Sequence, residues 1–374
     1  MTRIAVAALC CLVLAALAGA AGVGTPAAVA HLAFAGGIVP LIFAAMIHFV
    51  PVLTRTGDAP AAVRRLPWLA QASGGLAVAG FFGVLPYPAV FLAAFLDLGL
   101  AAALLAWIVR RARAALGTPH PGWRWYAAAV LLLMTALLAV LAMGIWPEHW
   151  LSWRRLHLHL NTLGLVGLAA FGTLPLLLPT ALGQPDPQAA GWLRRRLWPQ
   201  VAAVLLLAVG SALYWPLAVA GAAILVVIAL GLVAHWLRRF KAAALLGDGA
   251  VAALLAAVCG WLLCLFAGAL HGAGLIAARP TLAAWAAAFL LPLVSGALTQ
   301  LLPVWRHPGV RTPAREAMRD CLAVGGRWRG LLFFAAGLAF IADAAMPAGL
   351  LVGSALGWFV LRLIMAMRIA RPTR

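Results

Sequence analysis

Two histidines separated by one residue open an apolar segment of this chain. They are His157 and His159, in the run RRLHLHLNTLGLVGLAAFGTLPLLLPT that covers residues 154–180. Neutral imidazole is a good ligand for haem iron and for copper. A helix turns by about 100° per residue, so these side chains point roughly 200° apart and would serve different pockets. The alternative is that both only hydrogen-bond to a loop or to water at the helix end.

Four further residues are candidates for the same chemistry. His31 opens an earlier apolar segment and could pair with His157 or His159 as the second axial ligand of a haem. His271, in GALHGAG, has small neighbours that would let a planar ligand approach closely. Arg154 and Arg155 precede the histidine pair, and guanidinium groups suit haem propionates. The competing interpretation of these arginines is contact with lipid phosphates.

The elements that must position these residues are apolar helices. The chain is 66% hydrophobic and 9% charged, unlike a soluble domain. We predict about twelve membrane spans, each long enough to cross a hydrocarbon core of roughly 30 Å: residues 4–24, 28–53, 66–85, 87–109, 125–146, 157–181, 197–215, 216–236, 249–275, 282–304, 329–346 and 347–368. The first of these could instead be a cleavable signal peptide.

The net charge of +19 reports membrane topology and does not indicate a nucleic-acid partner. With twelve spans, all 27 basic residues except Arg154, Arg155 and Arg279 fall on one side of the membrane. The positive-inside rule makes that side cytoplasmic, with both termini inside, as in a bacterial-type inner membrane. His120, His235 and His307 fall in these basic loops or at their edges, where we expect them to be solvated.

The chain also shows a threefold internal repeat. Three segments align without gaps from His31, His159 and Ala283, and each has a proline twenty residues after its start, at Pro51, Pro179 and Pro303. Small residues precede these prolines by seven positions, at Ala44, Gly172 and Gly296. We therefore predict a single all-α membrane domain over residues 1–374, built from three four-helix arcs at approximately 1–120, 121–240 and 241–374.

Twelve spans in three arcs of four, with histidines opening the second helix of an arc, resemble subunit I of the haem-copper oxidase superfamily. The pattern of a histidine twenty residues before LLP is most similar to the C-type oxidases and nitric-oxide reductases, and to NnrS-like proteins. The resemblance implies a b-type haem, with copper as a second metal. His31 matches a low-spin haem ligand of the family, and His159 matches a copper ligand.

The sequence departs from the family where oxygen would be reduced. HLH at 157–159 looks like the His-x-His that the family carries on span 10, but here the span 10 positions are Thr281 and Ala283. Span 7 lacks the histidine pair that completes the copper site. We therefore do not expect oxidase activity.

The resulting prediction is a haem-binding membrane protein, with copper as an additional metal. Its role would be electron transfer, nitric-oxide or metal handling, or accessory service to a respiratory complex, with a redox partner protein. The alternatives are a twelve-span transporter without a cofactor and a degenerate structural subunit. Asp97, near the middle of its span, is either a protonated, hydrogen-bonded acid or part of a proton path.

Overall fold

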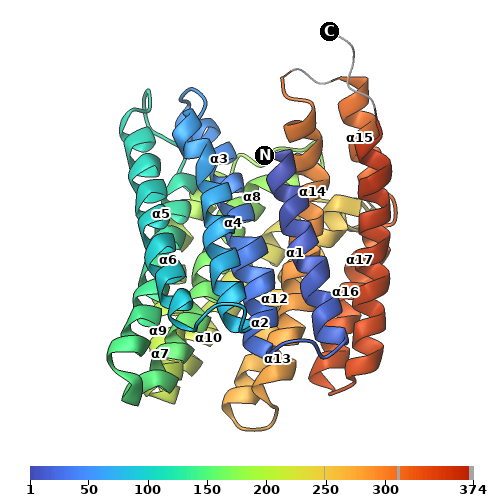
Figure 1. The fold of residues 1–374 in the computed structure, drawn as a ribbon. Coiled ribbons are helices and arrows are strands. Elements are labelled where there is room, and N and C mark those ends of the chain that lie inside the picture. Colours follow the sequence, from blue (N-terminus) through green and yellow to red (C-terminus); the bar gives the residue numbers. More distant parts are fainter. Residues whose placement is uncertain (248, 310–311, 370–374) are drawn as a thin grey trace. The chain divides into compact units, whose positions relative to one another are not determined.

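The computed structural model describes residues 1–247, 249–309 and 312–369. Every regular element within those ranges is a helix, and they contain no strand (Figure 1). The first half of the chain forms α1 (Thr2–Ala20), α2 (Pro26–Ala33), η1 (Phe34–Ile38), α3 (Val39–Thr54), α4 (Ala61–Phe81), α5 (Pro88–Arg113), α6 (Gly122–Ile145), η2 (Pro147–His149), α7 (Trp150–His159), η3 (Leu160–Gly167) and α8 (Leu168–Ala181). The second half forms α9 (Ala189–Leu213), α10 (Trp215–Arg239), α11 (Ala242–Gly247), α12 (Gly249–Gly272), α13 (Ala278–Trp285), η4 (Ala286–Leu290), α14 (Leu291–Arg306), α15 (Pro313–Ala323), α16 (Gly326–Ile341) and α17 (Ala345–Met367).

Within the described residues, eleven helical segments are long and apolar enough to cross a membrane. This confirms the predicted all-helical fold, with many helices long and apolar enough to span a membrane. One predicted span, 66–85, is not among these eleven segments. It corresponds to α4, which has 21 residues but carries Arg64, Arg65 and Gln71. Those polar side chains lower its hydropathy below that of the other eleven.

Large apolar side chains remain exposed along the middle of several helices. Phe95 on α5 is 63% exposed, and Leu350 on α17 is 66% exposed. Exposure of such side chains to water is unfavourable. In a bilayer the same surface faces lipid tails, which offer no hydrogen-bond partner, so apolar side chains suit it and the helix satisfies its own backbone groups. The exposed apolar surface therefore supports a bilayer environment.

The chain forms two compact units. Unit 1 holds Arg3–Thr173 and Gln188–Ile224, and unit 2 holds Leu174–Pro187 and Leu225–Arg374. The first repeat segment and most of the second lie in unit 1, and the third lies in unit 2.

Each of the three repeat segments contains a stretch of wider π-helix. η1 and η4 both begin three residues after the start of their segment, at Phe34 and Ala286, and η3 covers the matching positions of the second segment. π-Helix is rare and usually occurs as a single wide turn inside an α-helix. The three segments therefore resemble one another in backbone geometry as well as in sequence.

Pro40 explains the wide turn at η1. Proline has no N–H, and its ring clashes with the carbonyl group four residues earlier, which here belongs to Gly36. The Gly36 carbonyl oxygen instead accepts a hydrogen bond from Nε2 of Gln71 on α4, at 3.1 Å. Pro292 occupies the matching position after η4. The polar side chain that lowers the hydropathy of α4 thus satisfies a backbone group inside the apolar region.

The small residues seven positions before the repeated prolines permit close helix packing. A Cβ atom on Gly172 would lie 2.6 Å from Cβ of Trp125 on α6. A Cβ atom on Gly296 would lie 3.0 Å from the Leu254 side chain on α12. In both segments the missing side chain makes room for a residue of the preceding long helix.

Unit 2 contains a buried arginine, Arg329 on α16, whose side chain is 1% exposed. Its guanidinium donates to the hydroxyl groups of Ser295 and Thr299 on α14, at 3.1 and 3.4 Å, and to the Leu322 carbonyl at the end of α15, at 3.4 Å. It also lies 4.7 Å from the ring centre of Phe359 on α17. Through these contacts Arg329, which lies on α16, connects α14, α15, α16 and α17 of unit 2. Its positive charge also complements the dipole at the C-terminal end of α15.

Candidate functional site

The structure brings together two of the predicted site residues, His31 and His157. Their ring centres lie 6.2 Å apart, and the ring planes are within 9° of parallel. His31 belongs to α2 and His157 to α7, both in unit 1. The sequence predicted that His31 would pair with His157 or His159 as a haem ligand, and the structure places the His157 ring beside the His31 ring.

Both rings are held through the same nitrogen. Nδ1 of His31 lies 2.7 Å from the Ala27 carbonyl oxygen, one turn back on its own helix. Nδ1 of His157 lies 3.0 Å from the Ala136 carbonyl oxygen on α6. A carbonyl oxygen only accepts, so each of these hydrogen bonds places the proton on Nδ1 and leaves the lone pair on Nε2. This is the tautomer that a metal-binding histidine uses when its second nitrogen is fixed by the backbone. Nδ2 of Asn161 also lies 3.3 Å from Nδ1 of His157, a longer contact that would need the opposite tautomer.

Neighbouring side chains fix the orientation of the two rings. The Phe81 ring at the end of α4 stacks on His31, with centres 4.1 Å apart and planes at 29°. Asn161 on η3 donates from Nδ2 to the His157 carbonyl oxygen at 2.9 Å, one turn from the ring. Among the described residues, no hydrogen-bond partner is found for Nε2 of His31 or of His157.

The separation of the rings matches two ligands on opposite sides of one metal ion. A metal–nitrogen bond to imidazole is about 2 Å, and the nitrogen lies about 1 Å from its ring centre, so two such ligands have ring centres roughly 6 Å apart. The 6.2 Å found between His31 and His157 agrees with that value. Rings in direct stacking contact would lie closer, as His31 and Phe81 do. The ring-centre separation is therefore close to that of two imidazoles bound to one metal ion.

His159 lies on a different side of the same helix and has its own partners. Its Nδ1 is 2.8 Å from the Arg155 carbonyl oxygen and 2.9 Å from the Ser211 hydroxyl on α9. The expectation that His157 and His159 face different surroundings is thus confirmed: one contacts α6 and His31, and the other contacts α9.

The two arginines before the histidine pair make contacts away from the His31 and His157 rings. The Arg154 guanidinium lies 4.9 Å from the ring centre of Trp150. Arg155 donates to the Ser211 carbonyl oxygen at 3.4 Å, on the α9 side. Both side chains are exposed. Their interaction with haem propionates stays a prediction.

His271 has a local role at the end of α12. Its Nδ1 lies 3.0 Å from the Ile276 carbonyl oxygen in the following turn. The residue belongs to unit 2 and is exposed. Its proposed contact with a planar ligand stays a prediction.

Two loop histidines expected to be solvated are not. Nε2 of His235 on α10 is hydrogen-bonded to Oδ2 of Asp186 at 2.6 Å, and the Asp186 side chain is only 1% exposed. His307 is 6% exposed. The prediction was wrong because it considered only the charge of the surrounding sequence, and the acidic partner of His235 is 49 residues away.

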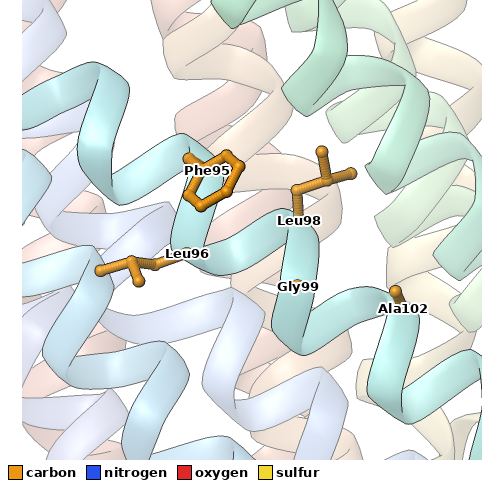
Figure 2. A pocket seen from close by; sticks show the side chains of 5 residues that line it. All are labelled: Phe95, Leu96, Leu98, Gly99 and Ala102. Atoms are coloured by element: carbon orange, nitrogen blue, oxygen red, sulfur yellow. The ribbon is translucent and has the colours of Figure 1, made fainter.

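No group of three or more His, Cys, Asp or Glu side chains suited to a metal ion occurs in the described part of the chain. A hollow on α5 is lined by Phe95, Leu96, Leu98, Gly99 and Ala102 (Figure 2). All five are apolar and come from one helix, so the hollow lacks the convergent polar groups of a binding site. The His31 and His157 pair remains the best candidate.

Sequence reasoning missed three of the contacts that hold this pair: Phe81, Ala136 and Asn161. Asn161 had a signal, since it lies four residues after His157 and therefore one helical turn away. Phe81 and Ala136 had none, because their helices contact the histidines only through tertiary packing.

Comparison with known proteins adds no assignment. No family model matches the chain, and no curated protein matches it.

Proposed function

We propose that this protein is a multi-span membrane protein that binds one haem between His31 and His157. The observation that carries the proposal is the pair itself: ring centres 6.2 Å apart, planes nearly parallel, and both Nδ1 atoms hydrogen-bonded to backbone carbonyls. Haem supplies one-electron redox chemistry, with a potential tuned by its axial ligands and surroundings.

The residues of this chain would act as ligands and as ligand supports. His31 and His157 would each donate the lone pair of Nε2. Ala27 and Ala136 would hold the rings through their carbonyl oxygens, which increases the basicity of the coordinating nitrogen. Phe81 would limit rotation of the His31 ring.

With His31 and His157 both holding it, a haem would supply one-electron transfer in preference to binding of oxygen or nitric oxide. We therefore propose an electron-transfer role within a respiratory membrane, in contact with a redox partner protein. Copper binding is a second proposal: His159 matches the copper ligand of the family, and its Nδ1 is held by the Arg155 carbonyl oxygen and the Ser211 hydroxyl.

We further propose that the fold is of the haem-copper oxidase type, with three arcs and both termini in the cytoplasm of a bacterial cell. The three π-helical stretches at one repeat position support the arcs. The three helical segments that contain them, together with Gly249–Gly272, are the most buried of the eleven spans in the described residues. That burial is what a set of central helices would show.

A visible absorption spectrum of the purified protein, oxidised and then reduced with dithionite, tests the proposal. We expect Soret and α bands in the natural protein and in His159→Ala, and their loss in His31→Ala and in His157→Ala. His159→Ala is the matched control, because it removes the neighbouring imidazole from the same helix. Colourless natural protein, or equal loss in all three variants, would contradict the proposal.

A further inference from the structure

Three nitrogen-bearing side chains come from separate segments at one end of unit 1. Arg55 is the C-cap residue of α3, His120 lies in the turn between α5 and α6, and Arg194 lies near the start of α9. The end of α3 and the turn between α5 and α6 lie at the same end of unit 1 (Figure 1).

Two hydrogen bonds hold these three segments together. The backbone N–H of His120 donates to the Leu53 carbonyl oxygen, close to the end of α3, at 2.8 Å. The indole N–H of Trp125, at the start of α6, donates to the Leu193 carbonyl oxygen at 3.0 Å, and Leu193 is the residue before Arg194. The start of α6 is thus joined both to the end of α3 and to α9.

The His120 ring offers an N–H group at this place. The backbone N–H of Gly122 donates to Nδ1 of His120 at 3.3 Å, so Nδ1 is the acceptor and the neutral ring carries its proton on Nε2. Burial, and then the positive charges of Arg194 and Arg55, lower the pKa of His120, which favours this neutral ring. Among the described residues, Nε2 of His120 has no hydrogen-bond partner.

The positive charges here have no carboxylate to balance them. Neither Arg55 nor Arg194 forms an ion pair with a described acid. The acids of unit 1 are Asp58, Asp97 and Glu148, and of these only Asp58 follows α3 at this end. The first turns of α6 and α9 also lack an acid, although the N-terminal end of a helix carries a partial positive charge. An imidazole N–H, two guanidinium groups and two helix N-termini therefore suit an oxyanion.

Exposed apolar side chains continue from both arginines. Val52 is 66% exposed and lies one helical turn before Arg55, and Trp198 is 67% exposed and lies one turn after Arg194. Because α3 ends here and α9 begins here, both apolar side chains lie farther into the membrane than the arginines. A molecule with an anionic group above an apolar chain matches this order, and a soluble anion uses only its polar part.

We propose that Arg55, His120 and Arg194 form a binding site for the phosphate head group of an anionic membrane lipid. The guanidinium groups pair with the phosphate oxygens, and Nε2 of His120 donates a hydrogen bond to one of them. The inference does not depend on haem binding, because Arg55 lies roughly 36 Å along the helical segment from His31.

Native mass spectrometry of the full-length protein in detergent tests the site, because it resolves single bound lipids. The probes are phosphatidylglycerol and phosphatidylcholine with the same acyl chains. We expect the first phosphatidylglycerol to bind more tightly than phosphatidylcholine, and this association to weaken at least about fivefold in Arg55→Gln/Arg194→Gln. Equal binding of the two lipids by the natural protein would overturn the proposal.

Arg113→Gln/Arg196→Gln is the matched control, since it removes two exposed arginines from α5 and α9. Arg196 projects about 200° away from Arg194 on the same helix. This control should keep the affinity for phosphatidylglycerol, and an equal loss in both double variants would show attraction by net charge alone and overturn the site. If Arg55→Gln/Arg194→Gln does not accumulate, Arg194→Gln and Arg196→Gln are compared with the same expectation.

Inorganic phosphate separates a lipid from a soluble anion. At the concentration of phosphatidylglycerol that half-fills the site, an equal concentration of phosphate should leave the lipid bound, because phosphate makes no contact with Val52 or Trp198. Displacement of the lipid by phosphate at that concentration would overturn the assignment to lipid. Neither measurement uses a haem signal, so this proposal and the proposed function fail separately.

Discussion

The Ser211 hydroxyl lies 2.9 Å from Nδ1 of His159, whereas the ring of His157, two residues earlier, faces His31. One helix therefore presents two histidines to two different neighbours. The ring centres of His157 and His31 are 6.2 Å apart, a separation suited to a shared iron. This relationship gives the two histidines different predicted roles.

Replacing His159 should affect packing but not haem content. In His159→Gln we expect haem per protein to stay within about twofold of the natural value, because the ligand pair is intact. We expect a stability loss of about 1 kcal/mol from the altered hydrogen bonds to Arg155 and Ser211. The pyridine haemochrome assay and a thermal melt in detergent measure the two quantities. Complete loss of haem would contradict the assignment.

Adjacent glycines on α4 should respond very differently to alanine. A Cβ atom on Gly74 would collide with the Ala35 carbonyl group of η1, whereas nothing lies within 4 Å of a Cβ on Gly75. We expect Gly74→Ala to cost about 1–3 kcal/mol, since the clash is with backbone that must shift. Gly75→Ala should leave the melting temperature unchanged or raise it slightly. Equal melting temperatures for the two variants would refute this packing of α4 on the π-helical stretch.

Arg329 should be much less replaceable than Arg327. Arg329→Met leaves Ser295, Thr299 and the Leu322 carbonyl without their charged donor, and we expect a loss of about 3 kcal/mol. Arg327 is exposed, so Arg327→Met should change stability by less than about 0.5 kcal/mol. Yield of folded protein and thermal melting separate the two. A tolerated Arg329→Met would rule out its role as a junction of four helices.

His120, in the turn between α5 and α6, should make stability depend on pH. Burial, and then the positive charges of Arg194 and Arg55, lower the pKa of His120 below its usual 6.5. The unfolded chain therefore binds a proton more readily than the folded one, so stability is present above about pH 6.5 and is lost as the pH falls below it. His120→Gln should flatten this part of the stability profile. A profile that is identical in both proteins between pH 5 and about 7 would contradict the assignment.

Helical periodicity was enough to predict much of the site. It gave the opposite directions of His157 and His159, since the angle between residues on a helix depends only on their spacing. Hydropathy likewise gave most of the spans, including the two that contain His31 and His157. Both properties are local, and a sequence pattern can report them.

The remaining features depend on contacts between helices. Sequence could not choose between His157 and His159 as the partner of His31, because that choice depends on which face of α7 is turned towards His31. The hydrogen bond from Gln71 to the Gly36 carbonyl oxygen was not predicted either, because the two residues lie on different helices. His235 was misplaced for the same reason: Asp186 lies on a distant loop.

Electron paramagnetic resonance of the oxidised protein tests the central claim most directly. Two axial imidazoles with ring planes within 9° of parallel should give a low-spin iron signal with well-resolved rhombic features, because parallel rings split the iron d orbitals most strongly. We expect this signal in the natural protein and in His159→Gln, and its loss in His31→Ala and His157→Ala. A high-spin iron signal, a low-spin signal of the type given by perpendicular rings, or protein without haem would contradict a haem held between His31 and His157.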